Sequence, residues 1–137
     1  MSNSQWIRHS SSDQWYYNNL LHKDNGPAII WDNGNKEWYT NGKRHKLDGP
    51  AVEKHSRREW WVEGNRHRVD GPAIEWINGH KEWFSNGQRH RVDGPAVERA
   101  DGEVEWYLYG FGYKSEEDWF NALIEDDQIA YLFKNKG

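Results

Sequence analysis

Histidine side chains recur along this chain in a pattern that raises the question of metal binding. Four of the seven histidines lie 22 or 23 residues apart, and each precedes an Asp or Asn by three residues. A metal needs its ligands within ~2.0–2.2 Å of one point, whereas equivalent side chains of stacked hairpins lie roughly 9–10 Å apart. We therefore expect no metal or other cofactor, and expect each histidine to be buried or half-buried and to bond to the corner or to the Asp-Gly turn. These histidines are His22, His45, His67 and His90.

Carboxylates are also periodic, which argues against an enzyme. A glycosidase needs two acids in one unique cleft, but each glutamate here has copies in the same surroundings, where a uniquely tuned pKa is not expected. The chain has no cysteine, and neither a glycine-rich phosphate loop nor a serine nucleophile elbow is found. We expect a protein without catalytic activity.

Basic and aromatic side chains are the candidates for binding a partner. Lys and Arg flank each repeated histidine, and in an extended strand they point together, forming a basic stripe that recurring glutamates either leave free or neutralise. An aromatic residue follows each repeated tryptophan and points outward if the tryptophan points inward, unless both faces are covered. The candidate residues are Tyr39, Arg44, Lys46, Trp61, Arg66, Arg68, Phe84, Arg89, Arg91 and Tyr107.

All of these side chains belong to one unit of 22 to 23 residues that is copied four to five times. A period of this size is typical of repeat arrays, which present surfaces for binding. Asn-Gly pairs between short aromatic runs predict hairpins with two or three antiparallel strands per unit. The Asp-Gly-Pro-Ala element predicts a sharp corner at a strand start. The tryptophans that mark the units are Trp15, Trp38, Trp60, Trp83 and Trp106.

The chain divides into an irregular segment (1–14), the repeats (15–113) and a helical cap (114–137). Ser115 is the expected N-cap, followed by acidic residues that the helix dipole favours. One apolar stripe is expected from Trp119, Phe120, Leu123 and Ile124. A second helix is expected from about Gln128 to Phe133. These helices would cover the last open edge of the array, or would also dock a partner.

Composition narrows the class of protein further. The 137 residues suffice for one domain, and the net charge of −4 argues against a general nucleic-acid binder. Leu, Ile, Val and Phe make up only about a sixth of the chain, so the ten tryptophans and seven tyrosines are expected to supply the core. No apolar run approaches the ~18 residues of a membrane span, and no signal peptide is visible. Together with the absence of cysteine, these features predict a cytoplasmic protein.

The unit resembles the MORN repeat over roughly residues 15–110. The matching W-x-x-x-G-x-x-H portion is Trp38–Gly42–His45 and its copies, although Lys or Arg replaces the usual glycine after the histidine, and Gly-Pro-Ala replaces the Gly-x-Gly stretch. The unit is also similar to the small D-G-P-A-x-E-W repeat proteins common in phage and bacterial genomes. The resemblance implies a hairpin solenoid that serves as a protein-interaction scaffold. Some MORN proteins are linked to phospholipid head groups, and the family brings no catalytic residue.

These observations predict an all-β solenoid of antiparallel hairpins with one or two C-terminal capping helices. The expected function is non-catalytic binding of another protein through the repeated arginine and aromatic face. The resemblance to phage repeats points to an inhibitor of a host defence protein. The alternative is a phosphate-rich ligand, either nucleic acid or an anionic phospholipid head group, bound along the basic stripe. A homo-oligomer is compatible with either reading.

Overall fold

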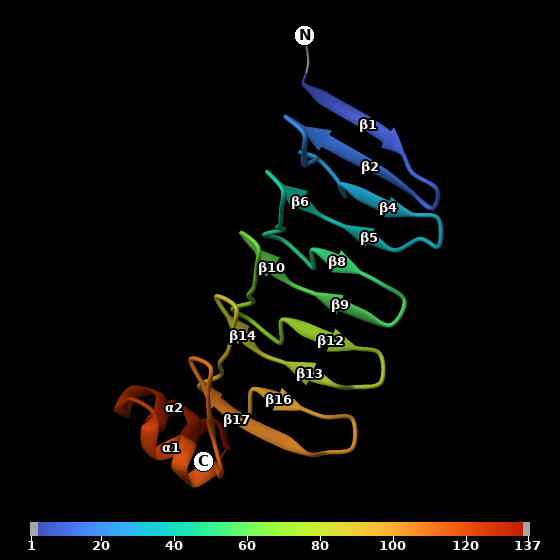
Figure 1. Ribbon diagram of the computed structural model, residues 1–137. Helices are drawn as coiled ribbons and strands as arrows, with labels where there is room; N and C mark the ends of the chain where they lie inside the picture. Colours follow the sequence, from blue (N-terminus) through green and yellow to red (C-terminus); the bar gives the residue numbers. More distant parts are fainter. Residues whose placement is uncertain (1–2, 136–137) are drawn as a thin grey trace.

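The computed structural model describes residues 3–135 as a ladder of β-hairpins with two helices at its C-terminal end (Figure 1). The hairpins join into one 12-stranded antiparallel sheet, in the order β1-β2-β4-β5-β8-β9-β12-β13-β16-β17-β18, with β3 paired to β2. The two ends of the chain lie at opposite ends of the ladder (Figure 1). The predicted all-β hairpin repeat with C-terminal helices is therefore confirmed.

Each complete unit contributes two strands to the main sheet and two strands to a small hairpin beside it, so it has four strands rather than the expected two or three. The main sheet comprises β1 (Ser4–Arg8), β2 (Ser12–Tyr17), β3 (Leu20–Leu21), β4 (Ile29–Trp31), β5 (Lys36–Glu37), β8 (Val52–Glu53), β9 (Arg57–Glu59), β12 (Ile74–Trp76), β13 (Lys81–Glu82), β16 (Val97–Glu98), β17 (Val104–Leu108) and β18 (Phe111–Tyr113). The small hairpins are β6 (Tyr39–Thr40) with β7 (Lys43–Arg44), β10 (Trp61–Val62) with β11 (Asn65–Arg66), and β14 (Phe84–Ser85) with β15 (Gln88–Arg89).

The segment 1–14, expected to be irregular, contains β1 and the start of β2. These strands pair antiparallel, with Trp6 opposite Trp15, so that β1 rather than β2 is the edge strand at this end of the sheet. Met1 and Ser2 lie outside the described residues.

The small hairpins turn through a residue of positive φ followed by glycine. Asn41 has φ 49° and Gly42 has φ 81°, as a type I′ turn requires at both central positions. Glu63 takes the same conformation, with φ 51°, although the sequence has no Asn-Gly pair there. The repeat therefore imposes the turn even where the local signal is weak.

The buried core is a row of small and β-branched residues at the start of each main-sheet hairpin. Four alanines are 0% exposed, and the residue after each is at most 6% exposed. The repeated tryptophans, expected to form the core, are instead only half-buried. The reason is that single Lys or Arg side chains, rather than a second sheet, cover the rings of Trp15, Trp38, Trp60 and Trp83. The core residues are Ala28, Ile29, Ala51, Val52, Ala73, Ile74, Ala96 and Val97.

The C-terminal cap consists of α1 (Glu116–Ala122) and α2 (Glu125–Asn135). Ser115 is the N-cap of α1, as predicted, since its side chain accepts a hydrogen bond from the Asp118 N–H at 3.1 Å. Trp119 and Leu123 are buried, but Ile124 is 68% exposed because α1 ends before it, with Leu123 in an extended conformation. The second helix is longer than expected, and residues 136 and 137 lie outside the described chain. No helix within residues 3–135 is long and apolar enough to cross a bilayer.

Candidate protein-binding face

A glutamate lies at the centre of each unit; it is buried at Glu37 and Glu59 and half-buried at Glu82 and Glu105. Glu37 is 4% exposed and accepts hydrogen bonds from Trp31 Nε1 at 2.8 Å, Arg44 Nη2 at 2.9 Å and Tyr39 Oη at 3.3 Å. Burial alone would raise the pKa of Glu37, but the bonds from Trp31 and Arg44 and the charge of Arg44 hold that pKa below its usual value. The carboxylate therefore stays ionised and fixes the side chains around it.

The same arrangement recurs in the following units. Glu59 is bonded by Arg57, Trp61 and Arg66; Glu82 by His80 and Arg89; and Glu105 by Arg99 and Tyr107. We call the side of the sheet that carries Glu37, Glu59, Glu82 and Glu105 the glutamate face.

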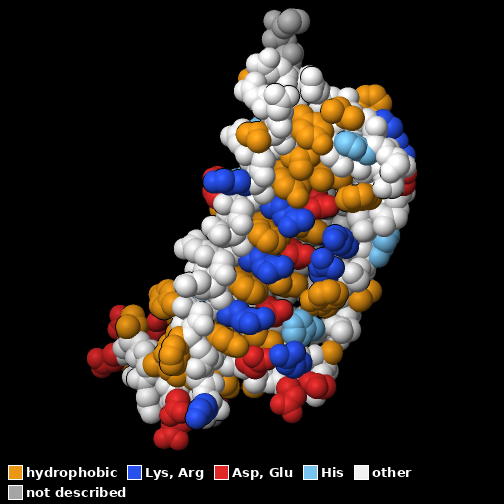
Figure 2. Space-filling model, viewed as in Figure 1, with side chains coloured by type: hydrophobic (Ala, Val, Ile, Leu, Met, Phe, Trp, Pro, Cys, Tyr) orange, Lys and Arg blue, Asp and Glu red, His pale blue; other side chains and the backbone are white. Residues whose placement is uncertain are grey.

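Arginines and aromatic rings alternate along the glutamate face. The Arg66 guanidinium carbon lies 5.0 Å from the Trp61 ring centre and 5.6 Å from that of Phe84. Arg44 likewise lies between the rings of Tyr39 and Trp61, and Arg89 between those of Phe84 and Tyr107. In Figure 2, basic, acidic and hydrophobic side chains alternate down the middle of the visible face. The arginine side chains are 36–44% exposed, while Phe84 is buried and the other three rings are half-buried.

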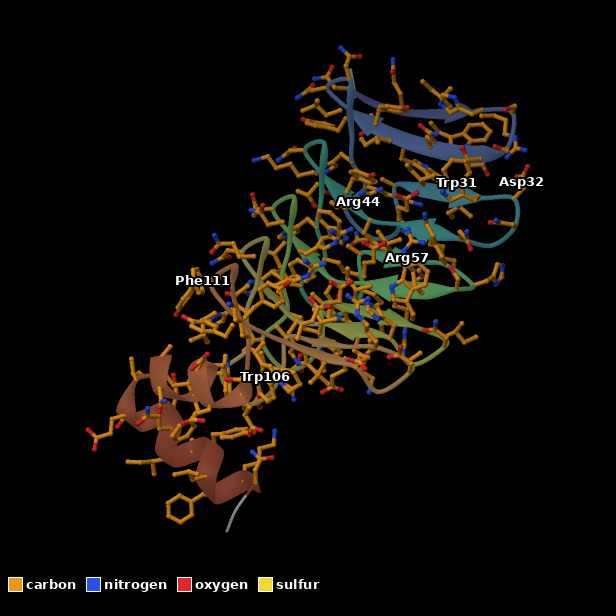
Figure 3. All side chains as sticks on the ribbon, turned by 60° about the horizontal axis from the view of Figure 1, so that its bottom comes forward. Trp31, Asp32, Arg44, Arg57, Trp106 and Phe111 are labelled. Carbon is orange, nitrogen blue, oxygen red and sulfur yellow. The ribbon has the colours of Figure 1, made fainter. Side chains whose placement is uncertain are left out.

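The glutamate face carries a second row of side chains, which lies across the glutamates from the small hairpins. Trp76 pairs with Arg57 across β12 and β9, and the Arg57 guanidinium lies 4.9 Å from the Trp76 ring centre. Figure 3 shows Trp31 and Arg57 on neighbouring hairpins of the ladder. These residues were not among the predicted site residues, although their equivalent positions in the repeat were a signal that could have identified them.

The remaining basic residues of the predicted stripe cover the repeated tryptophans on the opposite side of the sheet, the tryptophan face. The cationic groups of Lys46 and Arg68 lie 3.9 Å and 3.8 Å from the ring centres of Trp38 and Trp60, respectively. Arg91 covers Trp83 in the same way. The predicted single stripe is therefore wrong. Strand alternation ends with the small hairpin at Arg44 and its equivalents, so the basic residue two positions later turns to the other face.

The arginines of both rows are neutralised, which the sequence left as one of two alternatives. On the glutamate face, Arg44 and its equivalents each pair with a glutamate. On the tryptophan face, Arg68 pairs with Asp70 and Glu75, and Arg91 pairs with Asp93 and Glu98. These arginines therefore do not form a free positive stripe.

The repeated histidines join neighbouring units. His67 Nδ1 accepts a hydrogen bond from the Asn86 N–H at 3.0 Å, and Asn86 is the first turn residue of the next small hairpin. Three equivalent bonds link His22 to Asn41, His45 to Glu63 and His90 to Tyr109. The partner that all four histidines share is thus a backbone N–H in the turn of the next hairpin, and not the corner or Asp-Gly turn that was predicted. Only a neutral imidazole nitrogen accepts such a bond. His22 also makes a contact of the predicted kind, since its Nε2 lies 2.8 Å from Asp24 Oδ1 beside its corner.

Comparison of the chain with protein-family models, with curated proteins and with solved structures found no match.

Proposed function

We propose that this chain is a non-catalytic repeat module that binds another protein through its glutamate face. The observation that carries the proposal is the row in which Arg44, Arg66 and Arg89 alternate with four aromatic rings while each arginine is held by a glutamate. Tryptophan, tyrosine and arginine dominate the binding energy of protein interfaces. Their fixed positions here reduce the side-chain entropy that binding would cost.

A phosphate-rich ligand is the alternative that this face disfavours. Nucleic acid is held mainly by cations that replace condensed counterions, so its binding weakens steeply with salt. In both rows of the repeat, the arginines already have carboxylate partners. A ligand phosphate would have to displace those carboxylates, whereas a protein surface can pack on the rings and leave the pairs in place.

The narrower proposal is that the array is MORN-like and acts in the cytoplasm as a phage-type inhibitor of a host defence protein. The repeated Asp-Gly-Pro-Ala corner followed by Glu-Trp supports it through the resemblance described above. We infer the class of partner from this resemblance, and the contact surface from the side chains of the glutamate face.

Site-specific photo-crosslinking tests the proposal. A photoreactive phenylalanine analogue replaces Trp76 on the glutamate face or, as a matched control, Lys81, whose side chain points to the other side of the sheet in the neighbouring strand. We expect one protein from a lysate of host cells to crosslink at position 76 and not at position 81. Crosslinking to nucleic acid, or to the same protein only from position 81, would contradict the proposal.

A further inference from the structure

We use the word corner here for each Asp-Gly-Pro-Ala element together with the residue before it. At the last corner, which begins at Val92 and Asp93, the C-terminal helices contact the array. Val92 packs against the buried cluster that contains Trp119 and Tyr131. The neighbouring Asp93 accepts a hydrogen bond from Lys134 Nζ at 3.0 Å. Tyr131 and Lys134 are three residues apart in α2 and so lie on one side of that helix. The chain's own cap thus covers an apolar corner residue and pairs with the acid beside it.

The preceding corner has the same two residues without a helix. Val69 is 89% exposed, although it occupies the position of Val92 in its unit. Asp70 accepts a bond from Arg68, as Asp93 does from Arg91. Within residues 3–135, however, no second cation pairs with Asp70. This corner therefore exposes an apolar residue and an aspartate like those that contact the cap at Val92 and Asp93.

The corner before that repeats the arrangement with Leu47, which is 79% exposed, followed by Asp48. An open pocket lies between the two corners and is lined by Leu47, Trp60 and Val69. The next pocket is lined by Val69, Trp83 and Lys134 of α2. The open corners therefore lie in line with the corner that the cap already occupies.

The spacing of the corners fits a helix. Each unit adds two strands to the main sheet, so neighbouring corners lie about 9.5 Å apart at ~4.7–4.9 Å per strand. Residues seven positions apart in an α-helix lie on nearly the same side and about 10.5 Å apart. A helix parallel to the ladder can therefore place equivalent side chains on both corners.

We propose that the corners Leu47–Asp48 and Val69–Asp70 dock a basic amphipathic helix of another protein. Its apolar residues recur every seven positions, each followed three residues later by Lys or Arg, as Lys134 follows Tyr131 in α2. The apolar residues cover Leu47 and Val69, and the cations pair with the two aspartates. These corners lie beside the covered tryptophans and away from the glutamate face, so this contact is a second binding surface beyond the proposed function.

The probe is a fluorescent, stapled helical peptide with two Tyr-x-x-Lys pairs seven residues apart, titrated against the full chain and followed by anisotropy. We expect a dissociation constant below about 1 mM. Leu47→Asp with Val69→Asp should weaken binding at least about tenfold, as should changing both peptide lysines to glutamate. Asp48→Asn with Asp70→Asn should weaken it severalfold. Both corner apolar residues are exposed, so these variants are expected to fold, which circular dichroism checks.

Two control variants test whether the peptide binds at the corners Leu47–Asp48 and Val69–Asp70 and not elsewhere on the protein. Ile77→Asp changes a residue that is 83% exposed away from the corners, and Trp76→Ala changes the glutamate face; neither should alter peptide affinity. Absence of binding to the full chain, equal affinity for the Leu47→Asp/Val69→Asp variant, or equal affinity of the glutamate peptide would overturn the proposal. Each of these outcomes leaves the glutamate-face proposal standing, because that proposal is tested with different variants.

Discussion

Trp119 of α1 lies against the ring of Trp106, with the ring centres 4.7 Å apart. In the four preceding units a Lys or Arg eight residues after the tryptophan covers the equivalent ring. At the last unit an indole takes the place of the cation, where the sheet meets the helices (Figure 3). The cap is therefore attached to the array by a variant of the contact that each repeat makes within itself.

Replacing Trp119 should detach the cap. Trp119 is 0% exposed, and its Nε1 donates to the Arg91 carbonyl oxygen at 3.1 Å. Trp119→Ala should lower the free energy of unfolding by about 3–5 kcal/mol, measured by urea denaturation. Phe133→Ala, at a residue that is 78% exposed, should change it by less than about 0.5 kcal/mol. Similar losses in the two variants would show that the cap contact is not specific.

Acidification should weaken the hydrogen bond that His90 Nδ1 accepts from the Tyr109 N–H of the next turn. Burial lowers the pKa of the His90 imidazole below its usual value, despite the opposing charge of Asp127. The unfolded chain then binds a proton more readily than the folded chain, so stability is present above about pH 6.5 and is lost as the pH falls through the folded pKa. The melting temperature should fall between about pH 7.5 and about pH 5.5, and fall less in His90→Asn, which does not titrate. Equal falls in both proteins would contradict this assignment.

Removing one central glutamate should leave its donors without an acceptor. Glu59 is 4% exposed and is bonded by Arg57, Trp61 and Arg66. Because the two arginines are partly exposed, we expect Glu59→Ala to cost about 2 kcal/mol rather than the larger loss of a fully buried pair. Chemical denaturation measures the loss, and the exposed Glu103→Ala is the control. A cost no greater than that of the control would mean that the glutamates do not organise the face.

A turn residue offers a gain in stability. Glu63 adopts φ 51° where two equivalent turns have asparagine, a residue that tolerates this conformation better. Glu63→Asn should therefore raise the free energy of unfolding by about 0.5 kcal/mol. Thermal and urea unfolding would both register the change. A loss of stability would instead show that the Glu63 side chain contributes more than its backbone strain costs.

The sequence predicted the architecture well because the repeat amplified weak local signals. The Asn-Gly turn at Asn41, the Ser115 N-cap and the buried Trp119 all follow from short-range rules. The two faces of the array were harder to predict. Whether Arg44 and Lys46 share a face depends on where the small hairpin ends, and whether His45 bonds within its unit depends on how units stack. Both are long-range properties that residue spacing alone does not determine.

The most direct test of the central claim is the affinity of the crosslinked partner for two matched variants, measured by calorimetry over a salt series. Trp76→Ala with Arg89→Gln alters the glutamate face, and Arg58→Gln removes an exposed ion pair from the tryptophan face. We expect the first variant to bind at least about tenfold more weakly, with Arg58→Gln unchanged and little dependence on salt. Unaltered binding by the glutamate-face variant, or a loss confined to Arg58→Gln, would contradict the account.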